Sequence, residues 1–249
     1  MRTALLILVP LLQEPPKHYD PVVHEATRTF AYADFLIVPV RVHLLQCKEA
    51  DALHCRLKEE DVRRVFGKAN RIWNKAGLAL SLESIVSENA VCPEGFDAAR
   101  LEEFKATRPL AGAVAGMIHV YYVHQLPTNG VFMGRDAIFV KDTAALREVK
   151  GGVDEPLPRV TSHEIGHAMG LPHRQNTINL MASGTTGWST NDEEIETVRS
   201  WAAKQEWILS PPAAFEKGHD EILSAIPGES PLKEKATERL RKNSPATGK

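Results

Sequence analysis

The chain has 249 residues and a mass of 27.6 kDa, the size of one or two globular domains. Hydrophobic residues make up 43% and charged residues 25%, which excludes a collagen-like, coiled-coil or wholly disordered protein. The 30 basic and 32 acidic residues leave a formal charge of −2, so nothing indicates a nucleic-acid-binding stripe or a polybasic membrane-binding patch. We therefore expect a soluble globular protein without a nucleic-acid partner.

The first residues have the layout of a secretory signal. Arg2 precedes an apolar run over residues 4–12, and polar and proline residues follow at once. The run is too short for a membrane span, which needs about 20 apolar residues. The sequence thus predicts a signal peptide over residues 1–13 and a secreted or extracytoplasmic protein. No small-x-small cleavage site follows Leu12, and an apolar N-terminal strand or a wrongly assigned start is the alternative.

The three cysteines restrict the compartment only weakly. Cys47 and Cys55 are eight positions apart in a segment that reads as a loop, and they could close a small disulfide in an exported protein. Cys92 would then be left over. No Cys-x-x-Cys pair occurs, which argues against a cysteine-based zinc knuckle or redox motif.

The body of the chain begins with a strand and a long helix. Residues 33–46 are rich in β-branched and aliphatic side chains and predict a strand, in which Pro39 favours an edge position or a bulge. Apolar residues at spacings of three and four follow over residues 62–76, as in an amphipathic helix that packs on a core. The acidic residues 59–61 suit the first turn of this helix, and Gly77 suits its C-terminal cap.

Short strands and two further helices complete the predicted elements. We expect strands at residues 78–86, 116–124, 131–133 and 137–140, a less regular helix at 94–109, a helix at 156–169 and a last helix from Thr190. Thr190 and Glu193 have the spacing of a capping box for the last helix. This succession predicts an α+β fold with a mixed sheet.

The composition changes near the C-terminus. Prolines at 211, 212, 227 and 231 interrupt the preceding pattern, and residues 232–249 are mostly charged or small and polar. We therefore expect residues 210–249 to be a C-terminal extension that is partly disordered, with a solvated or frayed helix over residues 233–242.

One run of eleven residues carries the chemistry: His163-Glu164-Ile165-Gly166-His167-Ala168-Met169-Gly170-Leu171-Pro172-His173. Histidines at i and i+4 lie one turn apart on the same face of a helix, so both rings can bind one ion, and neutral imidazoles suit zinc. Gly170 can end the helix with a positive φ, so that His173 turns back towards the ion. Three histidines with a fourth position left for water are typical of a catalytic zinc site.

Glu164 lies next to the first histidine and points about 100° around the helix from it. There its carboxylate can act as the general base for a water molecule whose pKa the zinc ion lowers. The five fixed letters of the pattern arise by chance about once in ten thousand such sequences. The alternative is a helix whose histidines are exposed or hydrogen-bonded in the core.

The pattern His-Glu-x-x-His-x-x-Gly-x-x-His resembles the zinc signature of the metzincin metalloendopeptidases. That family has a methionine in a tight turn beneath the metal, and Met181, eight residues after His173, is the candidate. The Leu180-Met181 pair resembles the matrixin branch in its spacing. An ordinary core methionine is the alternative for Met181.

The resemblance covers residues 33–209 and implies a metzincin-like (zincin) catalytic domain. Such a domain has a mixed twisted sheet, a long core helix, a zinc-binding helix and a C-terminal helix. By the same analogy, residues 130–133 resemble the edge strand that holds an extended peptide, and residues 184–188 would form a wall of the neighbouring pocket.

The sequence also departs from several branches of the family. It lacks the tyrosine ligand of astacins, the cysteines that follow the third histidine in archaemetzincins, and traceable loops for calcium or a structural zinc. The other histidines are expected in core or surface roles: His18, His24, His43, His54, His119, His124 and His219.

We therefore predict a zinc-dependent metalloendopeptidase with one zinc ion held by His163, His167 and His173 and with Glu164 as general base. Its substrates are proteins or peptides, it has no membrane span, and a monomer is the default. Two other classes remain: a non-catalytic binding protein that retains the scaffold, and a hydrolase that acts on non-peptide amides.

Overall fold

The structure is a computed structural model that describes residues 25–109, 112, 114–134 and 137–243. The expected signal peptide over residues 1–13 lies outside the described residues, as do His18 and His24. Among the residues that the structure covers, no helix is both long and apolar enough to cross a membrane.

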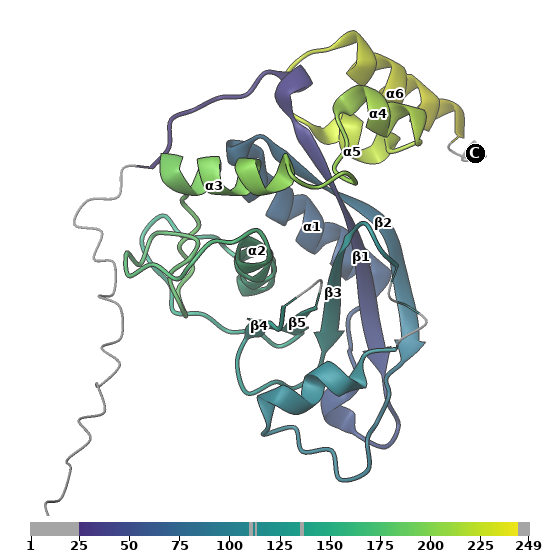
Figure 1. Cartoon of the computed structure of the whole chain (residues 1–249), viewed down its shortest axis with the longest axis vertical. Coiled ribbons are helices and arrows are strands. Elements are labelled where there is room, and N and C mark those ends of the chain that lie inside the picture. Colours follow the sequence, from purple (N-terminus) through teal and green to yellow (C-terminus); the bar gives the residue numbers. More distant parts are fainter. Residues whose placement is uncertain (1–24, 110–111, 113, 135–136, 244–249) are drawn as a thin grey trace, which may run out of the picture.

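In the part of the chain that the structure describes, five strands form one sheet at the centre of the molecule (Figure 1). They are β1 (Leu36–Gln46), β2 (Leu78–Asn89), β3 (Ile118–Val123), β4 (Gly130–Phe132) and β5 (Ile138–Lys141). Their spatial order is β2-β1-β3-β5-β4, and all neighbours are parallel except β4, which is antiparallel to β5. The mixed sheet and the α+β fold expected from the sequence are confirmed.

Pro39 shows how the sheet differs in detail from the prediction. β1 lies inside the sheet, between β2 and β3, so Pro39 is not on an edge strand. Its pairing with β3 begins only at Val40, and a register shift follows Pro39 between Val40 and Arg41. The missing N–H of proline therefore costs no ladder bond to β3, and the irregularity near Pro39 is an extra residue in the partner strand, Glu83 of β2, rather than a bulge in β1 itself.

The described residues form six α-helices besides the sheet: α1 (Glu59–Trp73), α2 (Pro156–Ala168), α3 (Asp192–Ala202), α4 (Pro211–Glu216), α5 (Asp220–Ala225) and α6 (Pro231–Asn243). Helix α1 buries the whole apolar stripe that its sequence shows, and a short 3-10 turn then leads to Gly77 at a φ of 66°. The helix expected at residues 94–109 is a shorter 3-10 helix, Leu101–Thr107. Helix α3 begins one residue later than expected, because Asn191 and Glu194 form the capping box instead of Thr190 and Glu193.

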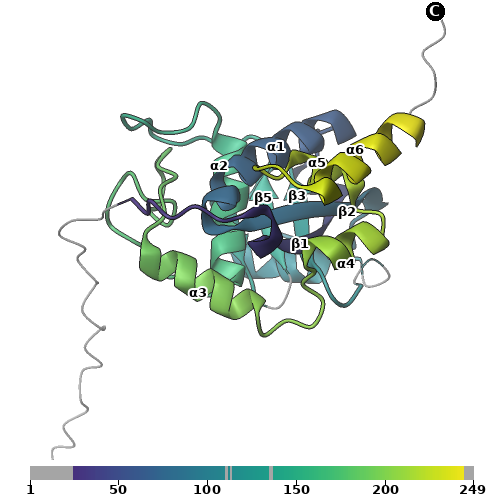
Figure 2. The same cartoon turned by 90° about the horizontal axis from the view of Figure 1, so that it is seen from above.

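Helices α1 and α2 pack on one face of the sheet and enclose the main hydrophobic core with it (Figure 2). A second cluster covers the opposite face, where Phe104, Tyr121 and Phe139 pack together. The sheet separates two of the cysteines, since Cys55 belongs to the first cluster and Cys47 to the second. All three cysteines are free thiols in the structure.

The C-terminal segment contains the expected helix over residues 233–242 as part of α6, and two further helices, α4 and α5, precede it. The end of the segment, residues 244–249, for which disorder was expected, lies outside the described residues. Helices α4, α5 and α6 pack around a third cluster at the start of β1 and β2, where Leu223 and Ile226 meet Tyr32 and Ile37. The segment beyond Pro211 is therefore packed against the body of the protein up to the end of α6.

Candidate metal centre

Helix α2 and the turn after it bring the three predicted histidines together. The Nε2 atom of His167 lies 3.1 Å from Nε2 of His163 and 3.1 Å from Nε2 of His173. Nitrogens bound tetrahedrally to zinc at 2.0–2.1 Å lie about 3.3 Å apart. The donor set thus fits one zinc ion with shifts of only a few tenths of an ångström. In the described part of the chain this is the one group of three or more His, Cys, Asp or Glu side chains with such spacing.

The other ring nitrogens hold two of these imidazoles in place. His163 Nδ1 donates to the Leu180 carbonyl at 2.8 Å, and His167 Nδ1 donates to the Leu171 carbonyl at 2.8 Å. A proton on Nδ1 leaves Nε2 as the free lone pair, which is the tautomer that a metal ligand needs. Burial lowers the pKa of His163 to about 3 and also lowers the pKa values of His167 and His173. All three rings are consequently neutral at neutral pH and lose no proton on binding a metal.

Gly170 makes the turn that returns His173 to the site. It has a φ of 92°, a left-handed conformation that side chains disfavour, and it directly follows Met169 at the end of α2. The N–H of Leu171 then bonds to the carbonyl of Gly166 at 2.9 Å, which closes the turn.

Met181 lies directly beneath α2. It is fully buried, and its sulfur would be 2.7 Å from a Cβ added at Gly166, next to His167. Only a glycine at position 166 lets Met181 come this close to α2. Met181 lies in a turn whose neighbouring carbonyl, that of Leu180, accepts the hydrogen bond from His163 Nδ1, and its role as the methionine of a metzincin turn stays a prediction.

Glu164 belongs to α2, and its carboxyl group lies against the edge strand β4. It is 5% exposed, and the backbone N–H of Phe132 in β4 faces its carboxyl group and lowers its pKa. A Cβ at Gly130 would be 2.9 Å from Glu164 Oε1, so β4 passes as close to the carboxylate as the backbone allows. Burial raises the pKa of Glu164 to about 8, although the Arg159 guanidinium opposes this shift. Such a carboxyl is suited to taking up and releasing a proton near neutral pH.

Arg159 is a buried cation that no sequence pattern singled out. It lies one turn before His163 and is 2% exposed, and burial lowers its pKa to about 10. Its guanidinium donates to the carbonyls of Gly187, at 2.9 Å, and of Ala182. Arg159 thus ties α2 to the segment after Met181, which includes the expected pocket wall over residues 184–188.

Four other histidines have hydrogen-bonded rings elsewhere in the described part of the molecule: His43, His119, His124 and His219. His43 and His119 are buried against each other beneath the sheet, with 2.8 Å between His43 Nε2 and His119 Nδ1. His124 has an acidic partner that the sequence did not suggest, because its Nδ1 lies 3.0 Å from Asp142 Oδ1. His219 Nδ1 lies 2.9 Å from Ser81 Oγ.

Gly130 was expected only as part of the edge strand over residues 130–133, and no sequence pattern predicted its closeness to Glu164 or the buried contact between Asn179 and Glu194. Local patterns do not predict these contacts, because each contact joins segments that are distant in the chain. Asn179 directly precedes the Leu180-Met181 pair, and this position is the one sequence feature that could have suggested a role for it.

Three similar solved structures have metzincin or metallopeptidase names. An archaemetzincin from Methanopyrus kandleri is 14% identical, with 67% of this chain and 96% of that chain covered and a TM-score of 0.44. The metalloproteinase-II from Bacteroides fragilis is 11% identical over 72% of this chain and 56% of its own, with a TM-score of 0.42. A zinc-dependent peptidase from Methanocorpusculum labreanum is 14% identical over 66% of this chain and 99% of its own, with a TM-score of 0.35.

No family model matches the sequence, and no curated protein matches it. None of the three structures is named a matrixin, so the assignment to the matrixin branch, which depends on the spacing of Met181, stays a prediction. Because the identities are low and the structural overlap is partial, the function has to be argued from the site itself.

Proposed function

We propose that this protein is a zinc-dependent metalloendopeptidase of the metzincin type, with the matrixin-like spacing between His173 and Met181. The observation that carries the proposal is the convergence of three neutral Nε2 atoms beside a buried carboxyl and an edge strand. A zinc ion held by His163, His167 and His173 would polarise the carbonyl of the bond to be cleaved and lower the pKa of a nearby water molecule.

Glu164 supplies the proton transfers of the reaction. Its carboxylate takes a proton from the attacking water and then delivers that proton to the leaving amine. The carboxyl lies beside the metal site without belonging to the three converging groups. It is held there by the Phe132 N–H and by the close passage of Gly130.

The backbone of an extended substrate can pair with strand β4. It is the last strand of the sheet, so one of its two edges is not paired within the sheet. A peptide added along that edge would form main-chain hydrogen bonds and pass directly over Glu164. This arrangement favours peptides over small amides and internal bonds over terminal ones. The layout of residues 1–13 further leads us to propose an extracytoplasmic location.

The test is peptide cleavage by the zinc-loaded protein and its Glu164→Ala variant. Both are incubated with a diverse peptide library, the products are identified by mass spectrometry, and bound zinc is measured in parallel. The variant should retain zinc and lose about 10²- to 10⁴-fold in turnover, the usual contribution of a general base. The control His167→Ala should lose both zinc and cleavage, because two ligands remain.

Two results would contradict the proposal. Wild-type turnover in a zinc-loaded Glu164→Ala variant would exclude Glu164 as the base. No cleavage of any peptide by the zinc-loaded wild type would instead favour a non-catalytic binding protein.

A further inference from the structure

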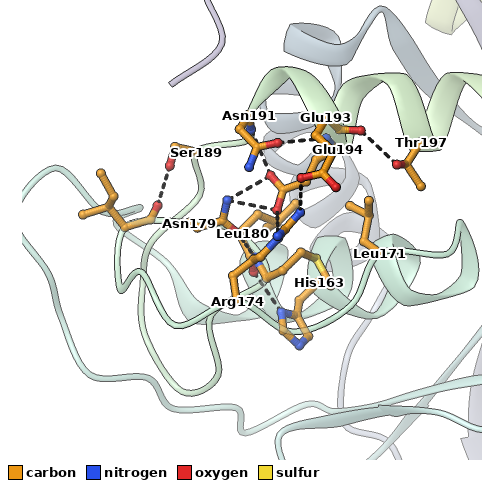
Figure 3. Close-up of polar contacts among 12 residues, drawn as sticks. His163, Leu171, Arg174, Asn179, Leu180, Ser189, Asn191, Glu193, Glu194 and Thr197 are labelled. Carbon is orange, nitrogen blue, oxygen red and sulfur yellow. Dashed lines mark hydrogen bonds and ion pairs between the residues drawn. The ribbon is translucent and has the colours of Figure 1, made fainter. Parts of the chain in front are cut away.

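Glu194 is a buried carboxylate on the first turn of α3, on a different element from any residue of the metal centre. It is 1% exposed, and both of its oxygens accept hydrogen bonds (Figure 3). Oε1 accepts from Arg174 Nε at 3.0 Å and from Asn179 Nδ2 at 3.1 Å. Oε2 accepts from Asn179 Nδ2 at 2.9 Å and from the Asn191 backbone N–H at 2.9 Å. Both partner side chains belong to the segment that surrounds the metal site.

The first connection runs through Asn179 to His163. The side-chain oxygen of Asn179 accepts from the Met181 N–H at 2.6 Å, while its amide group donates to Glu194. Leu180 lies between these two residues, and its carbonyl accepts the hydrogen bond from His163 Nδ1 (Figure 3). Glu194 therefore holds the side chain that fixes the direction of the Leu180 carbonyl, which in turn orients the His163 ring.

The second connection runs through Arg174 to His173. Arg174 directly follows His173, and its backbone N–H bonds to the carbonyl of Met181 at 3.0 Å. Its guanidinium reaches Glu194 and also Glu193 Oε2, at 3.0 Å. The chain immediately after His173 is thus held through its backbone by the methionine turn and through its side chain by α3.

This arrangement goes beyond what capping of α3 requires. The cap needs only the bond from the Asn191 N–H to Oε2 and the reciprocal bond from the Glu194 N–H to the Asn191 side chain. The Oε1 atom serves Arg174 and Asn179 instead. A buried ion pair such as Arg174–Glu194 adds little net stability and is better explained by the geometry that it imposes.

We propose that Glu194 is a positioning residue of the metal centre, which orients His163 through Asn179 and Leu180 and orients His173 through Arg174. The proposal rests on the zinc site of the proposed function. His167 provides an internal comparison, because its Nδ1 bonds to Leu171 within the turn after α2 and has no hydrogen bond to this network.

The test uses Glu194→Gln with Glu193→Gln as the matched control. The glutamine retains the shape of Glu194 but replaces one acceptor oxygen with a donor, so the buried donors around it lose acceptors. Glu193 is its chain neighbour, contacts the same arginine and has a side chain that is 74% exposed. Two quantities are measured: the zinc dissociation constant, by competition with a chelator, and the imidazole ¹⁵N and Nδ1–H signals of the zinc-loaded protein.

We expect Glu194→Gln to weaken zinc binding about 10-fold, at the lower end of the effect of groups that orient metal ligands. The imidazole signals of His163 and His173 should shift, and those of His167 should stay in place. Glu193→Gln should bind zinc like the wild type. Unchanged affinity and unchanged His163 signals in Glu194→Gln would overturn the proposal and leave Glu194 as a cap of α3 alone.

A second variant covers the case in which Glu194→Gln does not fold. Asn179→Ala leaves the Arg174–Glu194 ion pair and the helix cap intact, and it should shift the His163 signals more than those of His173. Equal signals in Asn179→Ala and the wild type would also overturn the proposal. A wild type that binds zinc but cleaves no peptide would refute the proposed function alone, because the zinc and imidazole measurements do not depend on cleavage.

Discussion

Because Gly130 has no side chain, the edge strand β4 can come close to Glu164. A Cβ at this position would lie 2.8 Å from Glu164 Cγ and 2.8 Å from Val160 Cγ1, both on the buried surface of α2. The backbone of Gly130 is not left-handed, so an alanine would be excluded by contact alone and not by conformation.

Gly130→Ala should therefore displace the Glu164 carboxylate or push β4 outwards. We expect turnover to fall about 10- to 100-fold with unchanged zinc content, because small errors in the placement of a catalytic group are costly. Steady-state peptide cleavage and metal analysis of the purified variant measure both quantities.

Gly67→Ala in α1 is the matched control, since no atom lies within 4 Å of a Cβ added there. It should leave turnover unchanged and stabilise α1 by up to about 1 kcal/mol. Full activity of Gly130→Ala would show that the carboxylate does not depend on this contact.

At the scale of elements, β1, β2 and β3 share a buried chain of polar groups. His119 Nε2 donates to the Val114 carbonyl at 2.7 Å, which leaves His119 Nδ1 to accept from His43 Nε2. In a neutral ring the Nδ1 of His43 is then an acceptor, and it faces the carboxyl of Glu88. Burial lowers the pKa of His43 to about 3 and raises the pKa of Glu88, so both shifts favour the neutral pair in which the proton is on the carboxyl.

Glu88→Gln should consequently be tolerated and should change how stability depends on pH. In the wild type the raised pKa of Glu88 stabilises the folded state below the ordinary value of 4.5, and this contribution is lost as the pH rises towards the folded value. The glutamine amide donates like the protonated carboxyl at every pH. The variant should be more stable than the wild type at pH 7, by less than about 1 kcal/mol because the side chain is partly exposed.

Urea unfolding at pH 4 and at pH 7 tests this expectation. The advantage of Glu88→Gln should disappear at pH 4, where Glu88 carries its proton in the unfolded chain as well. A variant that is less stable than the wild type at pH 7 would show instead that Glu88 is ionised and that His43 carries the proton.

At the scale of the whole molecule, the three C-terminal helices belong to the folded body. Leu223 and Ile226 on and after α5 are fully buried, and they pack with Tyr32 and Ile37 from the start of the described chain. The backbone of Ile37 is also paired with that of Leu209, just before α4. These contacts join both ends of the described chain to the first strand of the sheet.

Leu223→Ala should therefore destabilise the entire protein by about 2–5 kcal/mol, the usual cost of such a cavity. Thermal unfolding followed by circular dichroism should show one transition, shifted to lower temperature. Lys235→Ala on the exposed side of α6 is the control and should stay within about 0.5 kcal/mol of the wild type. A separate early transition in Leu223→Ala would show that α4–α6 unfold independently.

Features that depend on neighbours in the chain could be predicted from the sequence. The apolar stripe of α1, its acidic first turn and the glycine after it are local, and the structure has them as expected. The same holds for the i, i+4 histidines and for the turn at Gly170, since the geometry of one helix and one turn brings His163, His167 and His173 together. The exceptions are boundaries, such as the shift of the α3 cap from Thr190 to Asn191, where adjacent residues offer nearly equal caps.

Contacts between distant segments were decided only by the tertiary structure. The interior place of β1, the separation of Cys47 from Cys55 by the sheet and the packing of α4–α6 all depend on the order of strands, which local patterns do not encode. The eleven-residue motif by itself determined which side chains meet at the metal centre. What holds these side chains in place is the contact of Gly130 with Glu164 and the hydrogen bonds of Glu194 to Asn179 and Arg174. These contacts join residues that are fifteen or more positions apart in the chain, so they exist only once the chain has folded.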